Sequence, residues 1–341
     1  MSIAYKTELE IYDHLPEGFL DANAQELYQI LSGPSLIHLQ GENDQPVFVS
    51  ILQHGNEDVG LRAVQMLLKR YQDKLPRSIS IFVGNVAAAR YGARRLDGQP
   101  DYNRVWPGAE DFIDSAEYKV MQEVTMIMRD KRPFVSIDLH NNTGLNPHYA
   151  CINVLDDRFF YLASLFSRTV VYFLRPVGVQ SLAFAEICPS VTVECGRTGD
   201  QRGIEHAAEY LDACLHLAGF PEHSMPRQDI DLYHTVAITK VPENISFGFG
   251  SAKTDICFID DLDHYNFREV FPGMTIAHTS RDLDDFFQVI DEAGVDVTED
   301  YFVLEDNEIR FKQNVMPSML TLDEKVIRQD CLCYLMERYP L

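Results

Sequence analysis

Basic residues are scarce in this chain: 29 Lys and Arg stand against 52 Asp and Glu, which leaves a formal net charge of −23. This excess of negative charge argues against nucleic acid and anionic membrane surfaces as partners. Long apolar runs are also missing, since no stretch of about 18 consecutive apolar residues occurs, so we expect no membrane-spanning helix. The N-terminal stretch carries Lys6, Glu8 and Glu10 without an apolar core, so we expect no signal peptide.

Cysteine is present but follows no pattern. The seven cysteines are scattered, and none forms the C-x-x-C spacing of a redox or metal motif. An odd number of such residues is typical of reduced thiols, so we expect a cytoplasmic protein in which each cysteine is a small buried apolar residue. Hydrophobic residues make up 46% of the chain, which is enough for one large or two ordinary domains.

Apolar runs alternate with helical patterns in the first two thirds of the chain, which predicts an α/β fold with a largely parallel sheet. Residues after 226 instead show short β-like runs punctuated by Gly and Pro. We therefore expect two domains, residues 1–226 and a β-rich domain of residues 227–341. The predicted strands of the first domain cover residues 35–40, 47–53, 78–83, 134–139, 149–155, 169–173 and 190–193.

One turn in the first domain indicates chemistry. His54 and Glu57 follow a buried strand and precede a segment with helical spacing to about Leu75. Two side chains three positions apart at the start of a helix converge on one point. An imidazole and a carboxylate suit zinc, which at catalytic sites takes three protein ligands and leaves one position for water. The spacing alone is common by chance, so further ligands are needed.

Other polar residues sit at or just past the ends of predicted strands. They include Asn85, His140 and Glu194, and ligands bind at the carboxyl ends of strands in open α/β sheets. We therefore expect them to meet His54 and Glu57 at one edge, with His140 as the third zinc ligand. Glu194 lies on an otherwise apolar strand, where burial would raise its pKa toward that of a general base.

A long irregular insert, residues 87–108, supplies cations for the same edge. One arginine beside a metal can stabilise an oxyanion, and another can hold a substrate carboxylate. We expect Trp106, the only tryptophan, to pack the insert rather than to contact substrate. Asp138 lies two residues before His140, so it is either a hydrogen-bond partner of that ligand or a plain strand-end residue. The candidate cations are Arg90, Arg94, Arg95 and Arg104.

This set of residues resembles the succinylglutamate desuccinylase/aspartoacylase family of zinc carboxypeptidase-like proteins. The resemblance covers most of residues 45–200. It implies a zinc-carboxypeptidase-like mixed sheet flanked by helices, with a smaller β-rich C-terminal domain that narrows the active site. The motifs that carry it are His54-x-x-Glu57, Asn85, Arg94, Asp101-Tyr102-Asn103-Arg104, Asp138-Leu139-His140 and Glu194-Cys195-Gly196.

The resemblance also implies roles for single residues. One zinc ion per chain would bind His54, Glu57 and His140, and Glu194 would activate the water. Arg94 would polarise the scissile carbonyl. Arg95 stays an alternative, because the connection from Arg94 to Asn103 is longer than the family's usual one. Asn103 and Arg104 would grip the α-carboxylate of the substrate, and Asn85 is a further candidate for substrate binding.

The implied reaction is hydrolysis of the amide bond of a small N-acyl amino acid. The loops after His140 and Glu194 differ from those of the well-known members, so the acyl group stays open. Two alternatives remain at this point: a zinc metallocarboxypeptidase that cleaves peptides with the same residues, and a binding protein of the same fold without catalysis.

Overall fold

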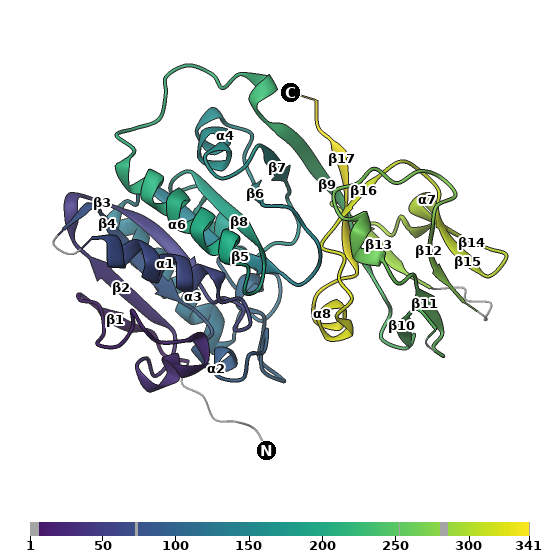
Figure 1. Ribbon diagram of the computed structural model, residues 1–341, viewed down its shortest axis with the longest axis horizontal. Helices are drawn as coiled ribbons and strands as arrows, with labels where there is room; N and C mark the ends of the chain where they lie inside the picture. Colours follow the sequence, from purple (N-terminus) through teal and green to yellow (C-terminus); the bar gives the residue numbers. More distant parts are fainter. Residues whose placement is uncertain (1–6, 72–73, 252, 280–285, 341) are drawn as a thin grey trace. The chain divides into compact units, whose positions relative to one another are not determined.

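The structure of the chain is a computed structural model that describes residues 7–71, 74–251, 253–279 and 286–340 (Figure 1). It divides into two compact units. The first comprises the chain up to Asn141 together with His148–Asp231, and the second comprises Asn142–Pro147 and the chain from Leu232 onward. No helix among the described residues is both long and apolar enough to cross a membrane.

A mixed β-sheet forms the centre of the first unit, with the strand order β1-β2-β4-β3-β5-β8-β6-β7. β3 lies parallel to both β4 and β5, whereas β2 is antiparallel to β4 and β6 is antiparallel to β8. The strands are β1 (Glu10–Tyr12), β2 (Ser35–Leu39), β3 (Gly41–Ile51), β4 (Leu75–Val83), β5 (Val135–Asn142), β6 (Tyr149–Ile152), β7 (Thr169–Tyr172) and β8 (Ser190–Arg197).

Helices cover both faces of this sheet because the side chains of a strand alternate between them. Gly60 of α1 faces Ile51 of β3 and Leu139 of β5, and α6 runs beside α1 (Figure 1). Phe48 points to the opposite face, where it packs with Val124 and other residues of α3. The helices of the first unit are α1 (Val59–Arg70), α2 (Val86–Ala89), α3 (Ala116–Lys131), α4 (Asp157–Ser164), α5 (Gln180–Phe184) and α6 (Gln201–His216), with 3-10 helices η1 (Ala24–Gln29), η2 (Tyr102–Arg104) and η3 (Arg227–Asp229).

The prediction of a helix to about Leu75 was wrong. α1 ends at Arg70, and Leu75 is the first residue of β4. The physical reason is the next residue, Pro76, whose ring disfavours helical backbone at the residue before it. Val47–Ile51 and Val135–Leu139 do lie in strands as predicted, and they place the following residues at the same edge of the sheet.

The second unit is rich in β-structure and has its own apolar core, which includes Phe258, Phe302 and Phe311. In one sheet β17 lies between β9 and β16, and β13 pairs with β9. The other sheet has five strands in the order β10-β11-β12-β15-β14. The elements are β9 (Asp231–Lys240), β10 (Phe247–Phe249), β11 (Ile256–Phe258), η4 (Leu262–Tyr265), β12 (Thr275–His278), β13 (Gln288–Asp291), α7 (Thr298–Tyr301), β14 (Phe302–Glu305), β15 (Glu308–Phe311), β16 (Met316–Ser318), α8 (Glu324–Gln329) and β17 (Cys333–Arg338).

Candidate metal centre

The turn that carries the first two candidate ligands begins with a strained residue. Leu52 follows the end of β3 with a φ of 53°, in the left-handed region that residues other than glycine seldom adopt. Such a conformation costs on the order of 1–3 kcal/mol and persists only where the surroundings enforce it. The backbone N–H of Asn85 donates to the Leu52 carbonyl over 2.6 Å, and that of Gly84 donates to the Ile51 carbonyl over 3.0 Å. The segment after β4 therefore holds the turn in place.

Gly55 lies between the two ligands and has no room for a side chain. A Cβ atom at this position would lie 2.2 Å from the backbone nitrogen of Ala89 and 2.5 Å from the carbonyl carbon of Ala88. Its N–H donates to the carbonyl oxygen of Arg94 over 3.1 Å. The turn is thus in direct backbone contact with α2 and with the insert, which fixes the direction in which His54 leaves the main chain.

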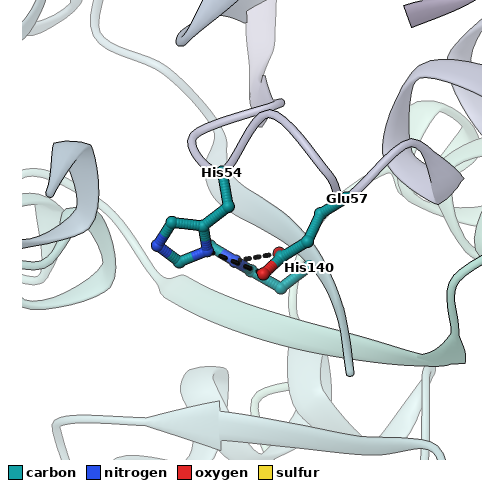
Figure 2. A group of neighbouring side chains, drawn as sticks. All are labelled: His54, Glu57 and His140. Carbon is teal, nitrogen blue, oxygen red and sulfur yellow. Dashed lines mark hydrogen bonds and ion pairs between the residues drawn. The ribbon is translucent and has the colours of Figure 1, made fainter. Parts of the chain in front are cut away.

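His54, Glu57 and His140 converge, as Figure 2 shows. The Glu57 carboxylate bridges the two rings: Oε1 lies 2.8 Å from Nδ1 of His54, and Oε2 lies 2.7 Å from Nδ1 of His140. One donor atom from each residue lies within 4.8 Å of the other two, and all three side chains are buried. Among the described residues, this is the group of His, Cys, Asp and Glu side chains whose geometry suits a metal ion.

The far nitrogen of each ring contacts a second carboxylate. Nε2 of His54 lies 2.9 Å from Oδ1 of Asp101, and Nε2 of His140 lies 2.8 Å from Oδ2 of Asp138. A carboxylate only accepts, so each Nε2 donates to the aspartate behind it, while each Nδ1 faces the Glu57 carboxylate, where a metal ion would replace the Nδ1 proton. Metal-binding histidines are usually oriented in this way by a carboxylate or carbonyl behind the ring. The donor set therefore fits a zinc ion held by two Nδ1 atoms and the Glu57 carboxylate.

Charges within the cluster compensate one another. Burial and Arg94 disfavour a charged His54, but Glu57 and Asp101 outweigh them, so its pKa is raised. Burial likewise disfavours a charged His140, yet Asp138 and Glu57 raise its pKa well above the ordinary value. Burial alone would raise the pKa of Glu57, but the two histidines lower it. The cluster is therefore a compact group of paired charges in which imidazoles and carboxylates stabilise one another.

Glu194 lies on β8, the strand next to β5 in the sheet, and is 7% exposed. Burial raises the pKa of its carboxyl to about 7, with His140 opposing and Glu57 adding to the shift. A carboxyl group with this pKa can take and return a proton near neutral pH, which is what a general base requires.

Arg94 lies beside the cluster. Its Nη2 donates to Oδ2 of Asp101 over 3.0 Å, and its Nη1 lies 3.6 Å from Oε1 of Glu57. The neighbouring Arg95 instead donates from Nη1 to the carbonyl oxygen of Gln99 over 2.9 Å. Of the two arginines, Arg94 is the one placed against a candidate metal ligand.

The remaining predicted residues differ in whether they contact the cluster directly. The amide nitrogen of Asn103 lies 3.2 Å from Nε2 of His140, whereas Arg104 donates from Nη1 to the Asn103 carbonyl over 2.8 Å. Asn85 accepts from the N–H of Ala88 over 3.0 Å and donates to Oε1 of Gln99 over 2.9 Å. Asn85 thus caps α2 and supports the insert, and its contact with substrate stays a prediction.

Two functional positions were not singled out by sequence reasoning. Asp101 was quoted only as part of a motif, although it holds both His54 and Arg94. Its position two residues before Asn103, in an insert rich in arginine, was the available signal. Gln53 carried no signal beyond its place next to His54. It is 1% exposed and donates from Nε2 to Oδ1 of Asp138 over 2.6 Å.

Fold and site together define a class: α/β proteins with a mixed sheet flanked by helices, a smaller β-rich part and a buried His-Glu-His cluster. Succinylglutamate desuccinylase from Vibrio parahaemolyticus is similar, with a TM-score of 0.60 at 14% identity over 91% of this chain and 87% of that one. The succinylglutamate desuccinylase from Chromobacterium violaceum has a TM-score of 0.57 at 16% identity, over 87% of this chain and 86% of that one. The succinylglutamate desuccinylase/aspartoacylase from Rhodobacter sphaeroides has a TM-score of 0.56 at 16% identity, over 89% of this chain and 88% of that one.

The predicted resemblance to the succinylglutamate desuccinylase/aspartoacylase family is thereby confirmed for the fold, and so is the predicted fold class. No protein-family model and no curated protein sequence matches the chain. At 14–16% identity, these similarities show the fold alone.

Proposed function

We propose that the protein is a zinc-dependent hydrolase that cleaves the amide bond of an N-acyl amino acid to give a carboxylate and a free amino acid. The observation that carries the proposal is the convergence of His54 Nδ1, the Glu57 carboxylate and His140 Nδ1 on one buried point. Both rings are locked by carboxylates behind them, as a ligand pair requires. The fold shared with succinylglutamate desuccinylases supports the choice of substrate class.

Each residue of the site has a separate task in this reaction. Zinc, when bound, supplies a Lewis acid that lowers the pKa of water and polarises a carbonyl. Glu194 takes a proton from the attacking water and returns it to the leaving nitrogen, which its pKa of about 7 allows. The Arg94 guanidinium stabilises negative charge on the carbonyl oxygen. Asn103 and Arg104 hold the α-carboxylate of the amino acid; the position of Asn103 next to His140 and the effect of the Arg104 charge on Asp101 support this role.

The remaining parts of the proposal concern the location of the protein, the number of zinc ions and the kind of partner. The odd number of scattered cysteines, none in a C-x-x-C pair, supports reduced thiols and a cytoplasmic location. We infer one zinc ion per chain, since the described residues form one such cluster. The partner is a small molecule.

The test begins with the metal content of protein purified without added metal. We expect about one zinc per chain, lost in His54→Ala. The protein is then assayed against N-acyl amino acids and, in parallel, against peptides, with release of free amino acid as the readout. Glu194→Gln is expected to retain zinc and to lower kcat by about 10²- to 10⁴-fold. The matched control is Glu209→Gln, the same change on the exposed side of α6, which leaves kcat unchanged.

The outcomes separate the alternatives. Faster release from peptides than from N-acyl amino acids would favour a metallocarboxypeptidase. Protein that takes up no zinc even after reconstitution, or that has no activity for Glu194→Gln to remove, would instead be a binding protein of the same fold.

A further inference from the structure

A chain of buried hydrogen bonds leads from the only tryptophan to a candidate metal ligand. The indole Nε1–H of Trp106 donates to Oε1 of Gln53 over 2.6 Å. Nε2 of Gln53 donates to Oδ1 of Asp138 over 2.6 Å, and Oδ2 of Asp138 accepts from Nε2 of His140 over 2.8 Å. Trp106 and Asp138 are fully buried and Gln53 is 1% exposed, so water does not substitute for these contacts.

The chain has a single possible direction. An indole N–H can only donate, so the amide of Gln53 must present its oxygen to Trp106 and its NH₂ group to Asp138. The Ser50 hydroxyl donates to the same Oδ1 over 2.6 Å. With Oδ1 occupied by two donors, Oδ2 is left to accept from Nε2 of His140, which leaves Nδ1 as the ring nitrogen that gives up its proton to a metal. The tryptophan thus acts on the orientation of the His140 ring through Gln53 and Asp138.

The corresponding support of His54 is built differently. Asp101 is neutralised by the guanidinium of Arg94, at 3.0 Å. The hydrogen-bond donors described for Asp138, apart from His140, are neutral groups of Gln53 and Ser50. A neutral donor holds a carboxylate in place without cancelling its charge, so Asp138 keeps its full effect on the ring of His140.

We propose that Trp106 and Gln53 are positioning residues of the metal centre, which fix Asp138 and thereby hold Nδ1 of His140 toward the ion. Gln53 directly follows Leu52, whose backbone lies in the left-handed region, so the residue that holds Asp138 lies in this strained turn. This inference rests on the proposed metal centre, and it is independent of which substrate is cleaved.

The test measures the zinc affinity of the full-length chain by competition with a chelator. Gln53→Met keeps the volume and removes the amide, and we expect about a tenfold rise in Kd, the lower end for such outer partners. Trp106→Phe keeps an aromatic ring and removes the donor, and we expect a smaller rise. In the Gln53→Met background, Trp106→Phe causes no additional rise, because the indole acts through the amide.

A packing control separates positioning from stability. Phe82 lies with its ring centroid 5.7 Å from that of Trp106 and has no part in the hydrogen-bond chain. Phe82→Leu is therefore expected to lower the unfolding temperature while leaving the zinc Kd unchanged. The indole gives a second readout, since a single tryptophan gives one indole N–H resonance in a nitrogen-15 spectrum. This resonance should move on addition of zinc in the wild type and stay in place in Gln53→Met.

Three results would overturn the inference: a zinc Kd within about twofold of the wild type in both Gln53→Met and Trp106→Phe, additive effects in the double variant, or an equal loss in Phe82→Leu. Trp106→Phe alone decides the question if Gln53→Met does not fold. A wild-type chain that binds zinc but cleaves no N-acyl amino acid would contradict the proposed function and leave this inference standing. A wild-type chain that binds no zinc would contradict both.

Discussion

At the scale of single residues, the candidate ligands depend on the aspartates behind them. Asp101 accepts from the backbone N–H of Asn103 over 2.8 Å and from Arg94 over 3.0 Å, and it contacts Nε2 of His54. His54 and Arg94 together lower its pKa well below the ordinary range, although burial opposes this. One carboxylate therefore couples a metal ligand to the arginine proposed to act on the substrate.

Replacement of this carboxylate by an amide tests the coupling. Asp101→Asn keeps the shape of the side chain but leaves Nε2 of His54 without an ionised partner. We expect zinc affinity to fall by about 10- to 100-fold, as measured by chelator competition. Asp97→Asn is the matched control, because Asp97 is an exposed residue of the same insert. Equal zinc affinity in Asp101→Asn and the wild type would show that His54 is oriented by other contacts.

At the scale of secondary structure, the position of the site follows from where strands end. Apolar periodicity was enough to predict that His54, His140 and Glu194 meet at one edge, because strand positions are local properties of sequence. The hydrogen bonds between Trp106 and Gln53, and between Asp101 and His54, join residues 53 and 47 positions apart. They depend on how the insert packs against the sheet, and no local pattern reports that packing.

The boundaries of helices and strands also fall into those that a local sequence pattern marks and those that it does not. The start of β4 at Leu75 is readable from Pro76, whereas helical spacing alone does not locate the first residue of α3, Ala116. There the Ser115 hydroxyl accepts from the N–H of Tyr118 over 3.0 Å and caps the helix. Helical periodicity locates the middle of a helix, whereas the position of its first residue depends on a single capping side chain.

A half-buried histidine where β2 pairs with β4 predicts how the stability of the protein depends on pH. His38 of β2 lies opposite Ser80 of β4, with Nδ1 and Oγ 2.8 Å apart. Burial and Lys131 lower the pKa of His38 from 6.5 to about 4, against an opposing effect of Asp13. The unfolded chain therefore binds a proton at a higher pH than the folded chain does. This contribution to the free energy of unfolding is complete above pH 6.5 and is lost as pH falls to about 4.

Urea denaturation at several pH values measures this effect. In His38→Gln we expect the free energy of unfolding to fall less steeply than in the wild type between pH 6.5 and about 4. His223→Gln, which alters an exposed histidine, serves as the control and should follow the wild-type curve. Parallel curves for His38→Gln and the wild type would contradict the assignment.

At the scale of the whole molecule, the two units have separate apolar cores, one around Phe48 and Phe184 and the other around Phe258 and Phe302. All three candidate ligands belong to the first unit. A ligand stabilises only the cooperative structure that binds it, by about 2.7 kcal/mol at a concentration one hundred times its Kd. Metal binding should therefore distinguish the units in an unfolding experiment.

Calorimetry of the full chain is expected to show two transitions, of which zinc raises only one. The same scan of His54→Ala should show no shift on addition of zinc. A single transition that moves as a whole would mean that the two units unfold together. Limited proteolysis near the first transition, with fragments identified by mass, assigns each transition to its unit.

Gly55 has a consequence for the recognition of distant relatives. The backbone of α2 occupies the place of any side chain at this position, so the restriction holds whatever side chains α2 carries. Sequences that have diverged to 14–16% identity while keeping one fold have exchanged most of their side chains. A steric limit set by one main chain against another survives such exchange. A search that demands glycine directly after the first histidine ligand should therefore find relatives that overall sequence similarity misses.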